Sequence, residues 1–158
     1  MSGLVDYHLP MLRGVAEGIG LPTVVQMARR PGVQVVYRVT VYYHDGRACN
    51  SVAMLLHTTG QGIACEVHYQ NALDGKPLTP EITPARFDDF VRALQNIGFD
   101  RMGDQPDLPS AADLWLVERA AGTFLHSVVI APDTANDNHA RIVNTVINGL
   151  QEALRQVS

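Results

Sequence analysis

The chain has 158 residues, of which 46% are hydrophobic and 18% are charged, and it carries a formal net charge of -4. This composition provides enough apolar side chains for the core of one ordinary domain, and it excludes disordered, collagen-like, coiled-coil and small disulfide-stabilised proteins. The negative net charge and the scattered arginines also argue against a nucleic-acid-binding protein.

The N-terminal segment, residues 1–32, is interrupted by several proline and glycine residues. Its remaining apolar stretches predict two short helices, near residues 8–18 and 22–30. Residues 33–158 are expected to form a sheet-and-helix core, so that residues 1–158 make a single domain. The N-terminus lacks a basic region followed by an apolar stretch, and every apolar run is shorter than a membrane span, which predicts a cytoplasmic protein with no membrane partner.

Residues 33–43 alternate between apolar and other side chains, a period of two that is typical of a half-buried strand. The Asp45-Gly46 dipeptide that follows predicts a tight hairpin turn, and the glycine-containing residues 59–62 predict a second one. Together these signals predict a three-stranded antiparallel meander over residues 33–70.

The turns also predict which residues face one another. If each turn has two residues at its tip, Val39 lies opposite Val52, and Met54 lies opposite Val67. The large apolar side chains of all three strands then share one face, which a shift of one residue would prevent. We therefore expect Val39, Val52 and Met54 on the face that the later helices cover.

Two amphipathic helices are predicted after the meander. Thr83 is suited to an N-cap, Pro84 to the first helical position and Gly98 to the C-terminal end, which predicts a helix over residues 84–97. A second apolar stripe at helical spacing predicts the final helix over residues 136–157.

A second hairpin is predicted from residues 113–119 and 123–131, which flank a turn at Ala121-Gly122. The fold class is therefore α+β: an antiparallel sheet of about five strands (the three-strand meander plus a hairpin), with two amphipathic helices on one face and a short helical N-terminal segment. This arrangement resembles that of many small bacterial accessory and immunity-like proteins, an analogy of fold only.

The sequence contains none of the common strings that mark a nucleotide site, a nucleophile elbow or a paired-cysteine zinc site. We therefore assign no catalytic, cofactor-binding or metal-binding residues, and we expect no cofactor. In the predicted register, His57, Glu66 and His68 share the second face of the sheet. A weak metal or anion site is one interpretation, but a solvated polar surface is favoured because metal sites need three or four supported ligands.

The second face of the predicted sheet combines apolar and polar side chains, as partner-binding surfaces often do. Its candidate residues are Arg38, Tyr42, Leu55, His57, Glu66 and His68. Two covers are open: a second copy of the chain in a homodimer, or the N-terminal 32 residues. We favour the homodimer, because the N-terminal segment is short and broken by glycine and proline.

These observations predict a non-enzymatic protein-interaction module, such as an accessory, regulatory or immunity-like subunit. Its partner would be another protein or a second copy of the chain, and neither a nucleic acid nor a membrane. Two alternatives stay open. One is a small-molecule binding domain with its pocket between the sheet and the N-terminal segment. The other is an uncommon enzyme that uses the surface of His57, Glu66 and His68.

Overall fold

A five-stranded antiparallel sheet forms the centre of the protein, whose computed structural model describes residues 8–158. The strands are β1 (Val33–Tyr42), β2 (Ser51–Thr58), β3 (Gly62–Tyr69), β4 (Leu114–Ala121) and β5 (Phe124–Ile130). Their order across the sheet is β3-β2-β1-β4-β5, so the second hairpin joins the meander through the pairing of β1 with β4. The predicted α+β class, with a meander and a hairpin, is confirmed.

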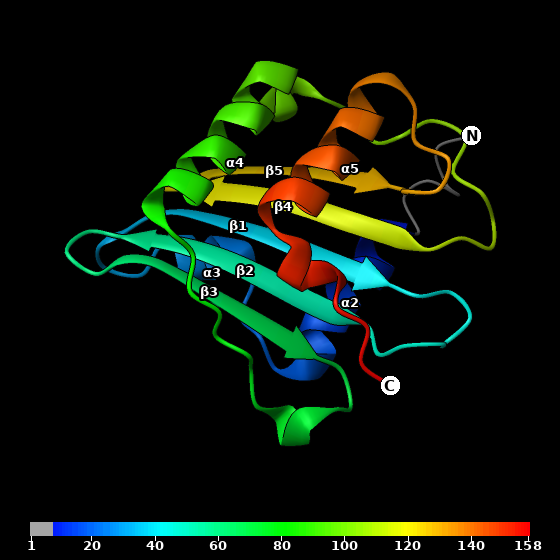
Figure 1. Cartoon of the computed structure of the whole chain (residues 1–158), viewed down its shortest axis with the longest axis horizontal. Helices are drawn as coiled ribbons and strands as arrows, with labels where there is room; N and C mark the ends of the chain where they lie inside the picture. The colour runs from blue at the N-terminus through cyan, green and yellow to red at the C-terminus, as the bar shows by residue number, and fades with distance from the viewer. Residues whose placement is uncertain (1–7) are drawn as a thin grey trace.

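Helices α4 (Pro84–Ile97) and α5 (Asp137–Gly149) cover one face of the sheet (Figure 1). The Thr83 side chain accepts a hydrogen bond from the Arg86 N–H, and Gly98 ends α4 in the left-handed region with a φ of 79°, so α4 has its predicted bounds. Helix α5 is shorter than predicted. The chain changes after Gly149 to the 3₁₀ turn η3 (Gln151–Leu154), which keeps Leu150 in the core.

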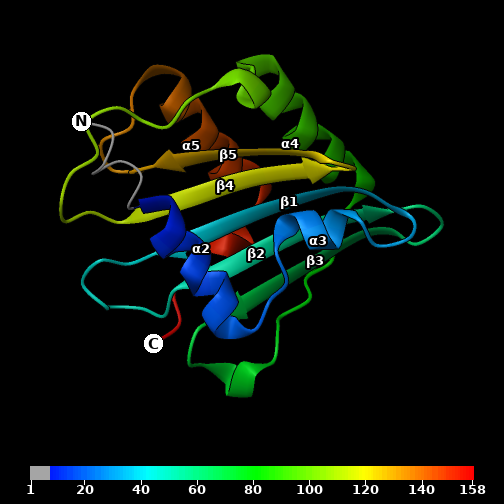
Figure 2. The ribbon, with the colours of Figure 1, turned by 180° about the vertical axis from the view of Figure 1, so that it is seen from behind.

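Helices α2 (His8–Ile19) and α3 (Val24–Ala28) lie on the opposite face (Figure 2). Thr23 begins α3 with a capping box, in which its side chain and that of Gln26 each bond the other residue's main chain. Residues 8–32 of the N-terminal segment thus cover the face for which we favoured a second copy of the chain. None of the helices within residues 8–158 is long and apolar enough to cross a membrane.

Strand β2 is turned over relative to the predicted register. Val39 lies opposite Ala53 rather than Val52, and Val67 also lies opposite Ala53 rather than Met54. Val39 is on the α4–α5 face as predicted. The prediction for Val52 and Met54 was wrong, because both side chains pack beneath α2 and α3.

Both connections of the meander differ from the two-residue turns that the prediction assumed. The β1–β2 ladder ends at the pair Val41 and Ser51, so a longer loop joins these strands. The β2–β3 ladder ends at Thr58 and Gly62, which leaves residues 59–61 at the tip. Each difference shifts the register by one residue, and the two shifts together reverse the faces of β2 alone.

Candidate functional site

The six predicted partner-surface residues are distributed over both faces of the sheet. Four of them lie on the α2–α3 face: Arg38, Tyr42, Glu66 and His68. The other two, Leu55 and His57, lie on the α4–α5 face. Because α2 and α3 cover the first of these faces and the core buries part of the second, the six residues do not form one continuous surface.

The predicted grouping of His57 with Glu66 and His68 is wrong. Leu55 is fully buried beneath α4 and α5, and its neighbour on the same face, His57, has its ring centroid 5.6 Å from that of Phe87. Glu66 and His68 are both on β3, where the Nε2 atom of His68 lies 2.9 Å from Oε1 of Glu66. Two residues are fewer than the three or four ligands of a typical protein zinc site.

A row of side chains crosses all five strands on the α2–α3 face. The strand pairing places Met54 between Glu66 and Arg38, and it places Glu118 between Arg38 and Ser127. Directly opposed residues of a sheet have Cβ atoms about 5 Å apart. The row therefore brings polar side chains from four strands into one line, with Arg38 and Glu118 near its centre.

Glu118 is only 2% exposed and is bound by both the sheet and α2. Its Oε2 accepts hydrogen bonds from Arg13 Nη2 at 3.1 Å, Arg13 Nε at 3.3 Å and Ser127 Oγ at 3.1 Å. Sequence analysis missed this residue and Arg13. The available signal was a glutamate within the apolar β4 strand, at a position that alternation assigns to a covered face.

Arg38 is a charged residue of this face that is only 3% exposed and uses little of its hydrogen-bonding capacity. Its Nη2 donates to the carbonyl oxygen of Pro22 at 2.6 Å and contacts the sulfurs of Met27 and Met54 at 3.1 and 3.4 Å. Its Nε and Nη1 groups have no acceptor among the residues described, and no ion pair in residues 8–158 includes this cation. Burial lowers the pKa of Arg38, and nearby Glu118 opposes that effect.

An open pocket of about 600 Å³ lies between the sheet and the two N-terminal helices. Its polar lining includes Arg13 and Glu17 from α2, and Arg38 and Glu118 from the sheet. Its apolar lining consists of Ala16, Leu21, Pro22, Val24, Val25 and Leu125. Apolar walls with a few convergent polar groups are the usual composition of a ligand pocket.

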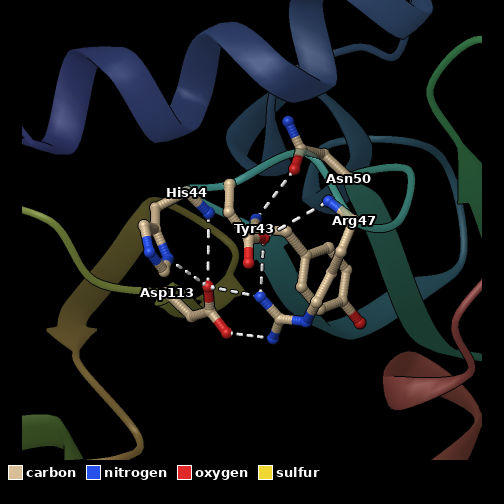
Figure 3. Close-up of polar contacts among 6 residues, drawn as sticks. Tyr43, His44, Arg47, Asn50 and Asp113 are labelled. Atoms are coloured by element: carbon tan, nitrogen blue, oxygen red, sulfur yellow. Dashed lines mark hydrogen bonds and ion pairs between the residues drawn. The ribbon is translucent and has the colours of Figure 1, made fainter.

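A second polar cluster joins the β1–β2 loop to the start of β4 (Figure 3). Asp113 accepts hydrogen bonds from the His44 main-chain N–H at 3.2 Å and from Arg47 Nη1 at 3.2 Å, and it is also bonded by Arg47 Nη2. Its Oδ1 lies 2.8 Å from His44 Nδ1. Hydrogen bonds from Arg47 are the main cause that lowers the pKa of Asp113 to about 2.

This cluster has some of the geometry of a metal site, because one ligand atom from each of His44, Asp45 and Asp113 lies within 4.8 Å of the others. Both oxygens of Asp113, however, already accept from Arg47, and the guanidinium also bonds Asp45. A cation is therefore already paired with these carboxylates. We interpret the cluster as a fastening of the loop, which the sequence analysis did not foresee.

No protein-family model matches the sequence, and no curated protein is significantly similar to it. The function therefore has to be argued from the chemistry of the site itself.

Proposed function

We propose that the chain is a binding domain for a small organic ligand, which occupies the pocket between the sheet and helices α2 and α3. The observation that carries the proposal is Arg38, a buried cation that lines this pocket and whose buried Nε group has no acceptor among residues 8–158. Buried polar groups are normally hydrogen-bonded, because an unpaired one costs about 1–3 kcal/mol. A ligand that supplies an acceptor removes this cost.

The walls of the pocket also support binding of an organic molecule. Six apolar residues line the pocket beside the polar groups, so a ligand can bury hydrocarbon and form hydrogen bonds at once. The pocket lies at the junction of the N-terminal segment and the sheet, where part of each wall comes from a different region of the chain. Binding would therefore also fasten α2 and α3 to the sheet.

The test is a screen of small organic fragments by chemical-shift mapping on isotope-labelled protein. Fragments that bind as proposed shift the amide resonances around Ala16, Val24 and Arg38. Val25→Trp places a large side chain in the pocket and abolishes these shifts, whereas Val143→Trp, a control at another partly buried helical valine, leaves them unchanged. Fragments that bind only elsewhere, or equally to both variants, contradict the proposal.

A second candidate function, protein interaction, is favoured by the open part of edge strand β5. The outer side of β5 is paired near Val129, where Gln105 N–H donates to the Val129 carbonyl at 3.0 Å and Asp104 accepts from the Val129 N–H at 2.8 Å. Outward main-chain groups alternate along an edge strand, so those of Leu125 and Ser127 also point outward. In the part of the chain that the structure describes, these groups have no hydrogen-bond partner.

The side chains of this open edge suit the addition of another strand. Phe124 and Leu125 are both exposed, and as consecutive strand residues they lie on opposite faces of β5. A strand added to the edge contacts both of them, which a partner docked on one face does not. A second copy of the chain, paired antiparallel about His126, forms such an isologous interface.

Sedimentation equilibrium tests this second candidate. The wild type is expected to exceed its chain mass of 17.2 kDa increasingly with concentration. Leu125→Pro removes an outward N–H and an exposed side chain, and it should stay monomeric. Ile147→Lys, at an exposed apolar residue of α5, is the control and should behave as the wild type. A wild-type mass of one chain throughout the micromolar range contradicts the self-association.

A further inference from the structure

We infer that the ligand of the α2–α3 pocket is a monoanionic carboxylate with an apolar tail, and that Arg38 binds its carboxylate group. This inference rests on the proposed function and adds the chemical class of the ligand. It follows from three properties of the pocket: the free donors of Arg38, the balance of charge around it, and the apolar walls.

The unused N–H donors of Arg38 favour a ligand that carries an oxygen acceptor. Its partners among the described residues, the Pro22 carbonyl and the sulfurs of Met27 and Met54, all contact Nη2. A methionine sulfur is a weak acceptor, so most of the hydrogen-bonding capacity of this guanidinium is unused. A carboxylate oxygen forms the short charge-assisted hydrogen bond that the Nη1 group lacks.

The charged side chains that line the pocket favour a ligand with a single negative charge. The pocket is lined by two arginines and two glutamates: Arg13, Arg38, Glu17 and Glu118. Arg13 and Glu118 are already paired at 3.1 Å, and Glu17 is exposed, which leaves Arg38 as the buried charge of this pocket that forms no ion pair with any residue the structure describes. One carboxylate neutralises Arg38. A doubly charged phosphate monoester would add an uncompensated negative charge beside Glu118.

The apolar walls account for the tail. Leu21, Val24 and Val25 line the pocket from the N-terminal segment, and Leu125 lines it from β5. A tail that packs between them gains about 0.8 kcal/mol for each buried methylene, which corresponds to about a fourfold gain in affinity. Affinity should therefore rise with chain length until the pocket is full.

Isothermal titration calorimetry with butanoate, hexanoate and octanoate tests the inference, with 1-octanol and octyl phosphate as the matched probes. We expect a dissociation constant that falls about fourfold per added methylene, and weaker binding of both matched probes. Arg38→Met keeps an apolar side chain of similar length in place of the cation. It should weaken octanoate binding by more than about tenfold and leave 1-octanol binding unchanged.

A second measurement keeps the test valid if Arg38→Met does not fold. In the wild type, octanoate should shift the side-chain Nε–H resonance of Arg38, and 1-octanol should not. If 1-octanol binds in the pocket as tightly as octanoate, the carboxylate inference is overturned while the proposed function stands. Tighter binding of octyl phosphate overturns the inference in favour of a dianion. If none of these probes and no fragment binds in the pocket, both fail.

Discussion

Arg38 and Glu118 lie directly opposite each other on β1 and β4, but each is bound by a different part of the N-terminal segment. Arg38 donates to the carbonyl of Pro22 at 2.6 Å, in the connection between α2 and α3, and Glu118 accepts from Arg13 of α2 at 3.1 Å. Two buried charges of the sheet thus hold the segment that covers them. The same contacts form one wall of the proposed pocket.

The first prediction concerns the pair of Arg13 and Glu118. Arg13→Gln removes the cation and leaves the Glu118 carboxylate, which is 2% exposed, with Ser127 Oγ as its remaining hydrogen-bond donor among residues 8–158. We expect a loss of about 2–4 kcal/mol in the free energy of unfolding, measured by urea denaturation, because an uncompensated buried charge is costly. Arg92→Gln, which breaks an exposed pair with Asp89, is the control and should change stability by less than about 0.5 kcal/mol. Equal effects of the two variants would contradict the role of Arg13.

The second prediction concerns acid stability and Asp113. Its pKa is about 2 in the folded protein, below the ordinary value of 3.8, so its contribution to stability is complete above pH 4 and is lost as the pH falls towards 2. Asp113→Asn should cost about 1–3 kcal/mol at neutral pH, because it weakens the bonds to His44 and Arg47. The difference from the wild type should shrink between pH 4 and pH 2, as thermal unfolding at each pH would measure. A difference that is constant over this range would show that the charge of Asp113 is not responsible.

The third prediction uses two glycines of opposite environment. A Cβ atom on Gly149 would lie 2.8 Å from Cδ1 of Phe90, so Gly149→Ala must displace a buried ring between α5 and α4. We expect it to destabilise the protein by about 1–3 kcal/mol. Gly14 is exposed within α2, and a Cβ there meets no atom within 4 Å. Gly14→Ala should therefore stabilise the protein by about 0.5–1 kcal/mol. Chemical denaturation measures the free energy of unfolding of both variants. If both substitutions change it in the same direction, the packing of α5 on α4 is contradicted.

The fourth prediction concerns the two free cysteines. Cys65 is buried on β3, and burial raises the pKa of its thiol to about 12, whereas Cys49 is only partly buried. The thiolate is the reactive form, so iodoacetamide at pH 8 should modify Cys49 well before Cys65 in the native protein. Mass spectrometry of digested samples measures the two rates. Labelling in denaturant, where both thiols are exposed, is the control, and equal native rates would contradict the burial of Cys65.

Local chemistry in the sequence was sufficient to predict most of the elements. The bounds of α4 depend on Thr83, Pro84 and Gly98, whose preferences act within a few residues of the chain. The alternation of residues 33–43 likewise marks β1, and it places Val39 on the correct face. These signals need no contact with distant parts of the chain, which is why they could be read without the structure.

The orientation of β2 was decided by the tertiary structure. Residues 52–56 are all apolar, so either face of β2 can enter a core, and alternation does not select one. The choice depends on the length of two loops and on the fact that α2 and α3 cover the second face of the sheet. The same covering turned Arg38 from a predicted surface residue into a buried one. Arg38 lies beside Glu118 because β1 pairs with β4, and Arg13 reaches Glu118 because α2 docks on the sheet. These contacts join segments that are far apart in the chain. The pattern of the sequence therefore does not reveal that the Arg38 guanidinium is buried with part of its hydrogen-bonding capacity unused.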